Sequence, residues 1–150
     1  MAGTLIILHS WIRWVALALI VVSIVFAAQK RNDALAKKLS IFTMASFHAQ
    51  FLIGILLYAI FSPTTQTAFA DMGAAMKNSQ LRFFVVEHLF GMVIAIALIS
   101  VGHVRAKKAS DDDTAAKRRL VFFAIGLVVT FLSIPWPFMP AGRPLFQLGG

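Results

Sequence analysis

The sequence contains no cysteine, a single tyrosine and only six acidic residues. The lack of cysteine excludes a disulfide framework, cysteine-ligated zinc, iron–sulfur clusters and covalently attached c-type haem. The chain also lacks a phosphate-binding glycine loop, a nucleophile elbow and the helix motif of zinc proteases. The sequence motifs of several common enzyme classes are therefore missing, and any chemistry has to come from other residues.

Charged residues are scarce as well, at 13% of the chain, whereas hydrophobic residues make up 59%. A soluble domain of this length rarely has so little polar surface, so we expect the apolar excess to face lipid. The net charge of +8 could indicate nucleic acid, but basic loops beside an anionic leaflet explain it better in so apolar a chain. The first apolar stretch is too long for a cleavable signal peptide and lacks a small-residue cleavage site. The composition predicts an integral membrane protein with no nucleic-acid partner.

Four apolar runs follow one another along the chain, at residues 4–28, 39–62, 81–104 and 120–140. Each approaches or exceeds the ~20 residues that a helix needs to cross a bilayer. The links between them are short, which implies antiparallel neighbours. We therefore expect one all-α transmembrane domain over residues 1–150, a four-helix up-down-up-down bundle. Pro135 and Pro137 should end its last helix, because alternate prolines interrupt helical hydrogen bonding.

The basic residues predict the orientation of these spans. The first and third links carry ten lysines and arginines, whereas the second link region and the C-terminal tail carry three. The positive-inside rule then places both termini and the 63–80 loop outside, in a multi-pass protein of the bacterial inner membrane. The tryptophans fall near the outer interface, as expected for an aromatic belt: Trp11, Trp14 and Trp136.

All four histidines lie inside or at the edges of the predicted spans, where histidine is costly and marks a candidate functional site. Counting ~1.5 Å per residue from the outer helix ends puts His9 about 6 Å deep and His88 about 10 Å deep. The same count places His48 roughly 21 Å deep and His103 roughly 33 Å deep, at the inner interface. His9 and His88 therefore share a level on two antiparallel helices.

Two imidazoles that meet at one depth can bind a haem iron from both faces. The sequence thus predicts His9 and His88 as axial ligands of one haem b. Gly91 follows His88 on nearly the same helix face, and its small size would let a flat porphyrin lie against the backbone. A purely structural role for both histidines is the competing reading.

Two arginines are candidate partners for the haem propionates. Arg13 lies one turn below His9, and Arg82 lies near the outer mouth. Glu87 is an equally good partner for Arg13, and its charge would also be satisfied by Arg82.

A second haem would need His48 and His103. Their predicted depths differ by about 12 Å, which helix tilt would absorb only in part. His88 and His103 lie on one helix, ~60° apart in rotation, and would instead anchor two stacked haems. Alternatively, His48 holds helices together by a hydrogen bond, and His103 is an interfacial cation among basic neighbours.

Two other classes of function remain open. His9, His88 and Glu87 would supply nitrogen and oxygen ligands to copper or zinc, although His48 lies about 11 Å too deep to complete that site. The chain would also be compatible with a non-catalytic assembly subunit of a membrane complex, whose buried polar residues only join helices.

Several segments resemble a family of small four-helix membrane proteins, found chiefly among Bacteroidetes-type bacteria and often labelled cytochrome b-like. The resemblance spans essentially the whole chain and is carried by four motifs: Leu8-His9-Ser10-Trp11-Ile12-Arg13-Trp14, Phe47-His48-Ala49-Gln50, Leu81-Arg82-Phe83-Phe84-Val85-Val86-Glu87-His88 and Ile134-Pro135-Trp136-Pro137-Phe138. It implies a histidine-ligated haem b in the membrane, with His9, His48 and His88 as motif-borne candidate ligands. The region around His103 is less distinctive of the pattern.

Together these observations predict a b-type haem protein that passes single electrons, with one haem expected and two conceivable. Iron with two histidine ligands has no open position, which suits electron transfer rather than substrate chemistry. With only 150 residues, the chain has little room for a soluble catalytic domain. We therefore expect an electron carrier or subunit that works with the lipid bilayer, a quinone, a redox partner protein or further copies of itself.

Overall fold

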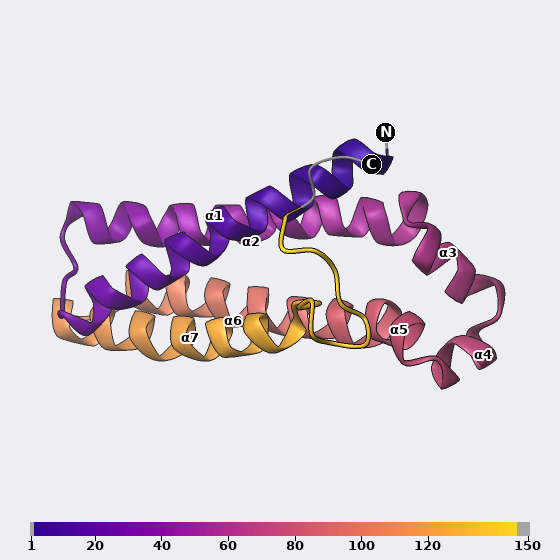
Figure 1. Cartoon of the computed structure of the whole chain (residues 1–150). Helices are drawn as coiled ribbons and strands as arrows, with labels where there is room; N and C mark the ends of the chain where they lie inside the picture. The colour runs from indigo at the N-terminus through magenta and orange to yellow at the C-terminus, as the bar shows by residue number, and fades with distance from the viewer. Residues whose placement is uncertain (1, 147–150) are drawn as a thin grey trace.

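The computed structural model describes residues 2–146, and within that range all regular secondary structure is helical. The predicted all-α class is confirmed for this part of the chain. The helices follow one another in this order (Figure 1): α1 Ala2–Ala28, α2 Ala34–Leu56, η1 Leu57–Phe61, α3 Pro63–Ala70, α4 Met72–Lys77, α5 Ser79–Arg82, η2 Phe83–Glu87, α6 His88–Lys107 and α7 Asp112–Ser133. The elements η1 and η2 are π-helical turns that continue α2 and lead into α6.

Three continuous helical stretches are long and apolar enough to cross a membrane: Gly3–Ala28, Ala34–Phe61 and Ser79–Lys107. Large apolar side chains cover their outer surfaces, such as Leu52 at 66% exposed and Phe90 at 62%. In water such a surface would be strongly unfavourable, whereas lipid tails solvate it. The length and the exposed apolar faces together support a transmembrane protein.

The fourth apolar run differs from its prediction. It is helical only as far as Ser133, where α7 ends and Ile134 turns to an extended conformation. Pro135 and Pro137 follow, so the helix ends where the prolines predict that it should. The first turns of α7 are charged, which leaves an apolar helical part of ~21 Å for residues 120–133. The predicted span over 120–140 is therefore too long. α7 ends beside His88, the first residue of α6, and so covers only part of the helical stretch Ser79–Lys107 (Figure 1).

The C-terminal tail, residues 134–146, lies where a longer α7 would have continued. It leaves the end of α7 and crosses to α1 (Figure 1). The tail is held by hydrogen bonds from Arg143 to the hydroxyl of Thr64 at 2.9 Å and from Trp14 to the carbonyl oxygen of Leu145 at 3.0 Å. A non-helical segment with several turns thus takes the place of helix in this half of the molecule.

The connection after the second span is also more ordered than the predicted loop over 63–80. It folds into the short helices α3, α4 and α5, each capped at its start. The side chains of Ser62, Asp71 and Asn78 accept hydrogen bonds from backbone N–H groups of the helices that follow them. These caps satisfy the free donors of the first turns and allow three short helices to form in succession.

Small residues bring α6 and α7 close together along the bundle. A Cβ atom on Gly102 would lie 2.5 Å from the Cβ of Phe122, and one on Gly126 would lie 3.0 Å from the side chain of Ile99. Phe123 is fully buried in the same region and belongs to the central apolar cluster with Ile99. The approach of the two helices therefore depends on glycine at these positions.

We expect Gly102→Ala to separate α6 from α7, because the added methyl group meets the Cβ of Phe122 rather than the end of a flexible side chain. Overpacking of this kind costs about 1–3 kcal/mol. Thermal unfolding of the purified protein in detergent, followed by circular dichroism, should show a lower Tm. Gly3→Ala is the matched control, because its new Cβ meets no atom within 4 Å. An equal Tm for both variants would contradict the proposed close packing.

Candidate functional site

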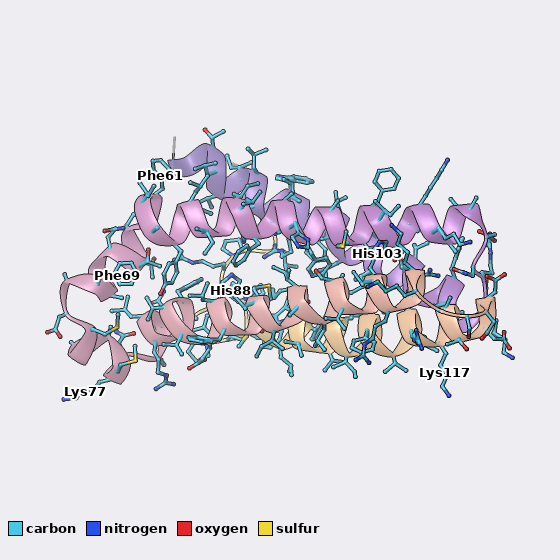
Figure 2. All side chains as sticks on the ribbon, turned by 180° about the vertical axis from the view of Figure 1, so that it is seen from behind. Phe61, Phe69, Lys77, His88, His103 and Lys117 are labelled. Carbon is cyan, nitrogen blue, oxygen red and sulfur yellow. The ribbon has the colours of Figure 1, made fainter. Side chains whose placement is uncertain are left out.

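His9 of α1 and His88 of α6 meet inside the bundle. The centres of their rings are 6.4 Å apart, and the ring planes are inclined by 75°. Figure 2 shows His88 directed into the space between the helices. The structure thus brings together the two histidines that the depth count placed at one level.

A hydrogen bond fixes the orientation and the tautomer of His88. Its Nδ1 lies 2.7 Å from the backbone carbonyl oxygen of Ser133, at the end of α7. A carbonyl oxygen only accepts, so Nδ1 carries the proton and donates. In the neutral ring Nε2 is then unprotonated and available as a ligand. Protein histidines that bind metals commonly have this arrangement, with the other ring nitrogen donating to a carbonyl or carboxylate.

Gly91 leaves the space that this hydrogen bond needs, a role that the sequence did not predict. A Cβ atom at this position would overlap the Oγ of Ser133. Gly91 therefore gives room to α7, one turn after His88. It is not among the residues that line the cavity described below.

The π-helical turn η2, Phe83–Glu87, sets the direction of His88. The backbone N–H of His88 donates to the carbonyl oxygen of Phe83, five residues earlier. One extra residue in a turn rotates the residues before it by ~100° relative to those after it. The hydroxyl of Tyr58 donates to the carbonyl oxygen of Val85 at 3.1 Å, which satisfies an acceptor within the widened turn.

His9 is held from α2. The side-chain amide of Gln50 donates to the backbone carbonyl oxygen of His9 at 2.9 Å. A Cβ on Gly54 would lie 3.3 Å from the Cε1 of His9, so the imidazole packs directly on the backbone of α2. Among residues 2–146, the buried Nδ1 of His9 has no hydrogen-bond partner. The ring therefore keeps an unused polar atom inside the bundle, where such atoms are normally paired.

A cavity of about 480 Å³ adjoins the two histidines, within the range of roughly 300–1,000 Å³ that is typical of small-molecule sites. Its walls come from α1, α2, α6, the end of α7 and the C-terminal tail. The apolar lining includes Phe47, Phe51 and Met92, and the cationic lining consists of Arg13 and Arg143. The cavity thus combines apolar walls with a few polar groups, as cofactor sites do.

Arg13 links this cavity to the tail. Its guanidinium donates to the carbonyl oxygen of Leu145 at 2.5 Å, while its buried Nε has no hydrogen-bond partner in the described part of the chain. Within residues 2–146 no carboxylate forms an ion pair with Arg13. Its charge is compensated only by neutral groups, the oxygens of Ser10 and Leu145 and the ring of Trp14, which leaves it suited to bind an anionic group.

The other predicted site residues lie elsewhere. Arg82 and Glu87 pair with each other at 2.8 Å, and both are about half exposed and outside the cavity lining. His48 is exposed, and its Nδ1 donates to the carbonyl oxygen of Met44 in its own helix at 2.8 Å. The Nδ1 of His103 lies 2.9 Å from the Oγ of Ser40, nearer the opposite end of the bundle from the short helices (Figure 2). The structure therefore brings His9, His88 and Arg13 together but not the remaining candidates.

A bare-metal site would need more ligands than the two histidines. In residues 2–146 no group of three or more histidine, cysteine, aspartate or glutamate side chains is placed to hold a metal ion. Zinc sites in proteins use three or four such ligands. The pair of imidazoles provides two nitrogen ligands, as the axial positions of a haem require.

No protein-family model matches the sequence, and neither the curated proteins nor the solved structures include a match to this chain.

Sequence reasoning did not identify Gln50, Gly54 or Ser133 as parts of the site. Gln50 could have been identified from the sequence. It is a side-chain amide in the uncharged apolar run over 39–62, and because lipid offers no hydrogen bonds, it needs a partner within the protein. Ser133 could not have been identified in this way, because it contacts His88 through its backbone carbonyl oxygen, which every residue has.

We expect Arg13→Met to loosen the tail, because Leu145 loses a charged hydrogen-bond donor. Bonds of this kind contribute about 1.5–3 kcal/mol, so amide exchange in residues 134–146 should rise roughly tenfold or more in hydrogen–deuterium exchange. Arg82→Met removes a comparable side chain that does not contact the tail and should leave that exchange unchanged. Similar tail exchange in both variants would show that Arg13 does not hold the tail.

Proposed function

We propose that the chain is a membrane-embedded b-type haem protein that transfers single electrons, with His9 and His88 as the two axial ligands. The observation that carries this proposal is the separation of 6.4 Å between their ring centres. Two metal–imidazole bonds of about 2 Å, plus the distance of about 1 Å from each ring nitrogen to its ring centre, would give about 6 Å between the ring centres. The two rings therefore already lie at the spacing that a shared iron requires.

Further observations support the fit. The hydrogen bond to Ser133 leaves the Nε2 of His88 as the free nitrogen, and His9 has a buried ring nitrogen that no described residue satisfies. Phe83 and Phe84 lie with ring centres 6.1 and 6.2 Å from that of His88, so the site has aromatic walls. An apolar, partly enclosed site of this kind suits a large flat cofactor.

The cationic residues of the cavity have a defined role in this proposal. Arg13 and Arg143 line it and would pair with the propionates, whereas Arg82 is engaged by Glu87. Their positive charges would also favour the reduced form of a neighbouring redox group. Haem held by His9 and His88 would supply a one-electron couple suited to electron transfer rather than to oxygen chemistry.

The membrane arrangement is part of the same proposal. α1, α2 with η1, α6 with its preceding turns, and α7 with the C-terminal tail would form the four spans, with the arginine- and lysine-rich end in the cytoplasm. Both termini and the short helices α3–α5 would then lie outside a bacterial inner membrane. The apolar walls of the cavity would allow a quinol to approach as electron donor, with the acceptor on another protein.

Purified wild-type protein from haem-replete cells should be red, with a Soret band and a sharp α band after reduction. His9→Ala and His88→Ala should each abolish the α band, because each removes one axial ligand. His48→Ala is the control: its side chain is exposed and bonds only its own helix, so the spectrum should be unchanged.

Colourless wild-type protein would overturn the haem proposal, and elemental analysis would then distinguish copper or zinc binding from a metal-free assembly subunit. Retention of the full reduced spectrum by His88→Ala would contradict the assignment of the ligands. Circular dichroism of each variant should show wild-type helix content, so that loss of colour reports loss of a ligand rather than of the fold.

A further inference from the structure

A second cavity lies at the end of the bundle far from the short helices, and nothing in the haem proposal uses it. Its volume is about 480 Å³. It is formed by the α1–α2 connection, the start of α2, the end of α6 and the first turns of α7. The residues that matter for its chemistry are Asn32, Lys37, His103, Lys107, Asp112 and Arg119.

Arg119 is the most informative of these residues, because its side chain lies in the interior. The residue is only 3% exposed. Its guanidinium donates to the carbonyl oxygen of Arg31 at 3.4 Å and to the Oδ1 of Asn32 at 3.0 Å. Its buried Nε has no hydrogen-bond partner among residues 2–146, and no carboxylate in that range forms an ion pair with it.

A buried guanidinium without a counter-ion is unfavourable, since desolvation is not offset by an opposite charge. Two further cations, Lys37 and Lys107, line the same cavity with exposed side chains. In the described part of the chain neither of them forms an ion pair. The cavity thus presents three fixed positive charges around a common space.

Two carboxylates also line the cavity, and three of their four oxygens accept hydrogen bonds from neighbouring residues. Asp111 caps α7 and accepts hydrogen bonds from the backbone N–H and the hydroxyl of Thr114. These bonds hold the pKa of Asp111 below its ordinary value. Asp112 accepts from the side-chain amide of Asn32 at 2.7 Å. Both carboxylates are therefore directed at local donors, and the free donors of the cavity are cationic.

We propose that this cavity binds a phosphate group, which Arg119 contacts from the interior and Lys37 and Lys107 contact from the rim. Guanidinium and ammonium groups are the side chains that recognise phosphate in proteins. Ile41 lines the cavity and is 49% exposed on the apolar surface of α2. The phosphate site therefore adjoins the lipid-facing surface, as expected for the headgroup of an anionic phospholipid.

The test uses two matched double variants of the full chain. Lys37→Gln with Lys107→Gln removes two charges from the cavity rim. Lys38→Gln with Lys117→Gln removes two exposed charges at the same end that do not line the cavity. Native mass spectrometry of delipidated protein, titrated with phosphatidylglycerol, phosphatidylcholine or inorganic phosphate, measures binding to each variant and to the wild type.

We expect one phosphatidylglycerol to bind the wild type in preference to phosphatidylcholine. Loss of the two rim lysines should weaken this binding roughly 25-fold, from about fivefold per lysine near an anionic surface, and the control pair should change it little. Preferential binding of phosphatidylglycerol assigns the site to a lipid headgroup. Saturation by inorganic phosphate that depends on the same rim lysines also supports the site and assigns it to the free anion. Equal weakening in the two double variants, or no binding of any phosphate, would overturn the proposal.

Arg119→Lys and Arg119→Met examine the interior contact. Arg119→Met removes the hydrogen bonds to Arg31 and Asn32, and Arg119→Lys lacks the two-pronged guanidinium that makes them, so both are expected to lower the Tm of the lipid-free protein. Only Arg119→Lys keeps a charge in the cavity, and it should therefore bind phosphatidylglycerol more tightly than Arg119→Met. Equal affinities would contradict the role given to Arg119.

Discussion

The hydrogen bond between the Nδ1 of His88 and the carbonyl oxygen of Ser133 connects the fold to the site. It requires α7 to end at Ser133, close to α6, and it requires Gly91 to leave space for the serine side chain. The prolines after Ser133 fix where the helix ends. The close packing that continues along α6 and α7 at Gly102 and Gly126 holds the two helices at the necessary distance.

Two cavities lie on either side of a central apolar cluster, and the buried polar side chains nearest that cluster, such as Ser23 and Thr43, are hydrogen-bonded to each other. Ala16, Ile20, Phe47, Ile99 and Phe123 form the central cluster. On one side of it lies the cavity with His9 and His88, and on the other lies the cavity with Arg119. Each cavity contains a buried arginine nitrogen that no described residue satisfies. Since such atoms are uncommon in native proteins, both cavities are suited to hold an anionic or metal-containing ligand.

Much of the fold could be predicted from the sequence, because apolar run length and helix-breaking residues are local properties. Three membrane-length helices lie where three of the four apolar runs predicted them, and Pro135 ends the last helix. The helical conformation of the charged residues at the start of α7 and the non-helical C-terminal tail were not predicted, since hydropathy does not show where a helix begins or ends. The short helices α3–α5 depend on caps that a composition count does not detect.

The candidate site was predictable only in part. Equal depth along the helices was enough to suggest that His9 and His88 meet, because the helical rise is constant. The direction in which each side chain points around its helix axis was not predictable. The π-helical turn before His88, for example, rotates the residues before it by about 100° relative to those after it. The same limit applies to His48, which points outward, and to Gly91, which faces α7. Hydrogen bonds from backbone carbonyls, such as that of Ser133, carry no residue-specific signal at all.

The central claim is that His9 and His88 hold one iron between them. Electron paramagnetic resonance of the oxidised wild-type protein, purified from haem-replete membranes, tests it most directly. Two imidazole ligands predict the low-spin signal of a six-coordinate ferric haem, at one haem per chain. A high-spin signal, or a preparation without haem iron, would contradict the account.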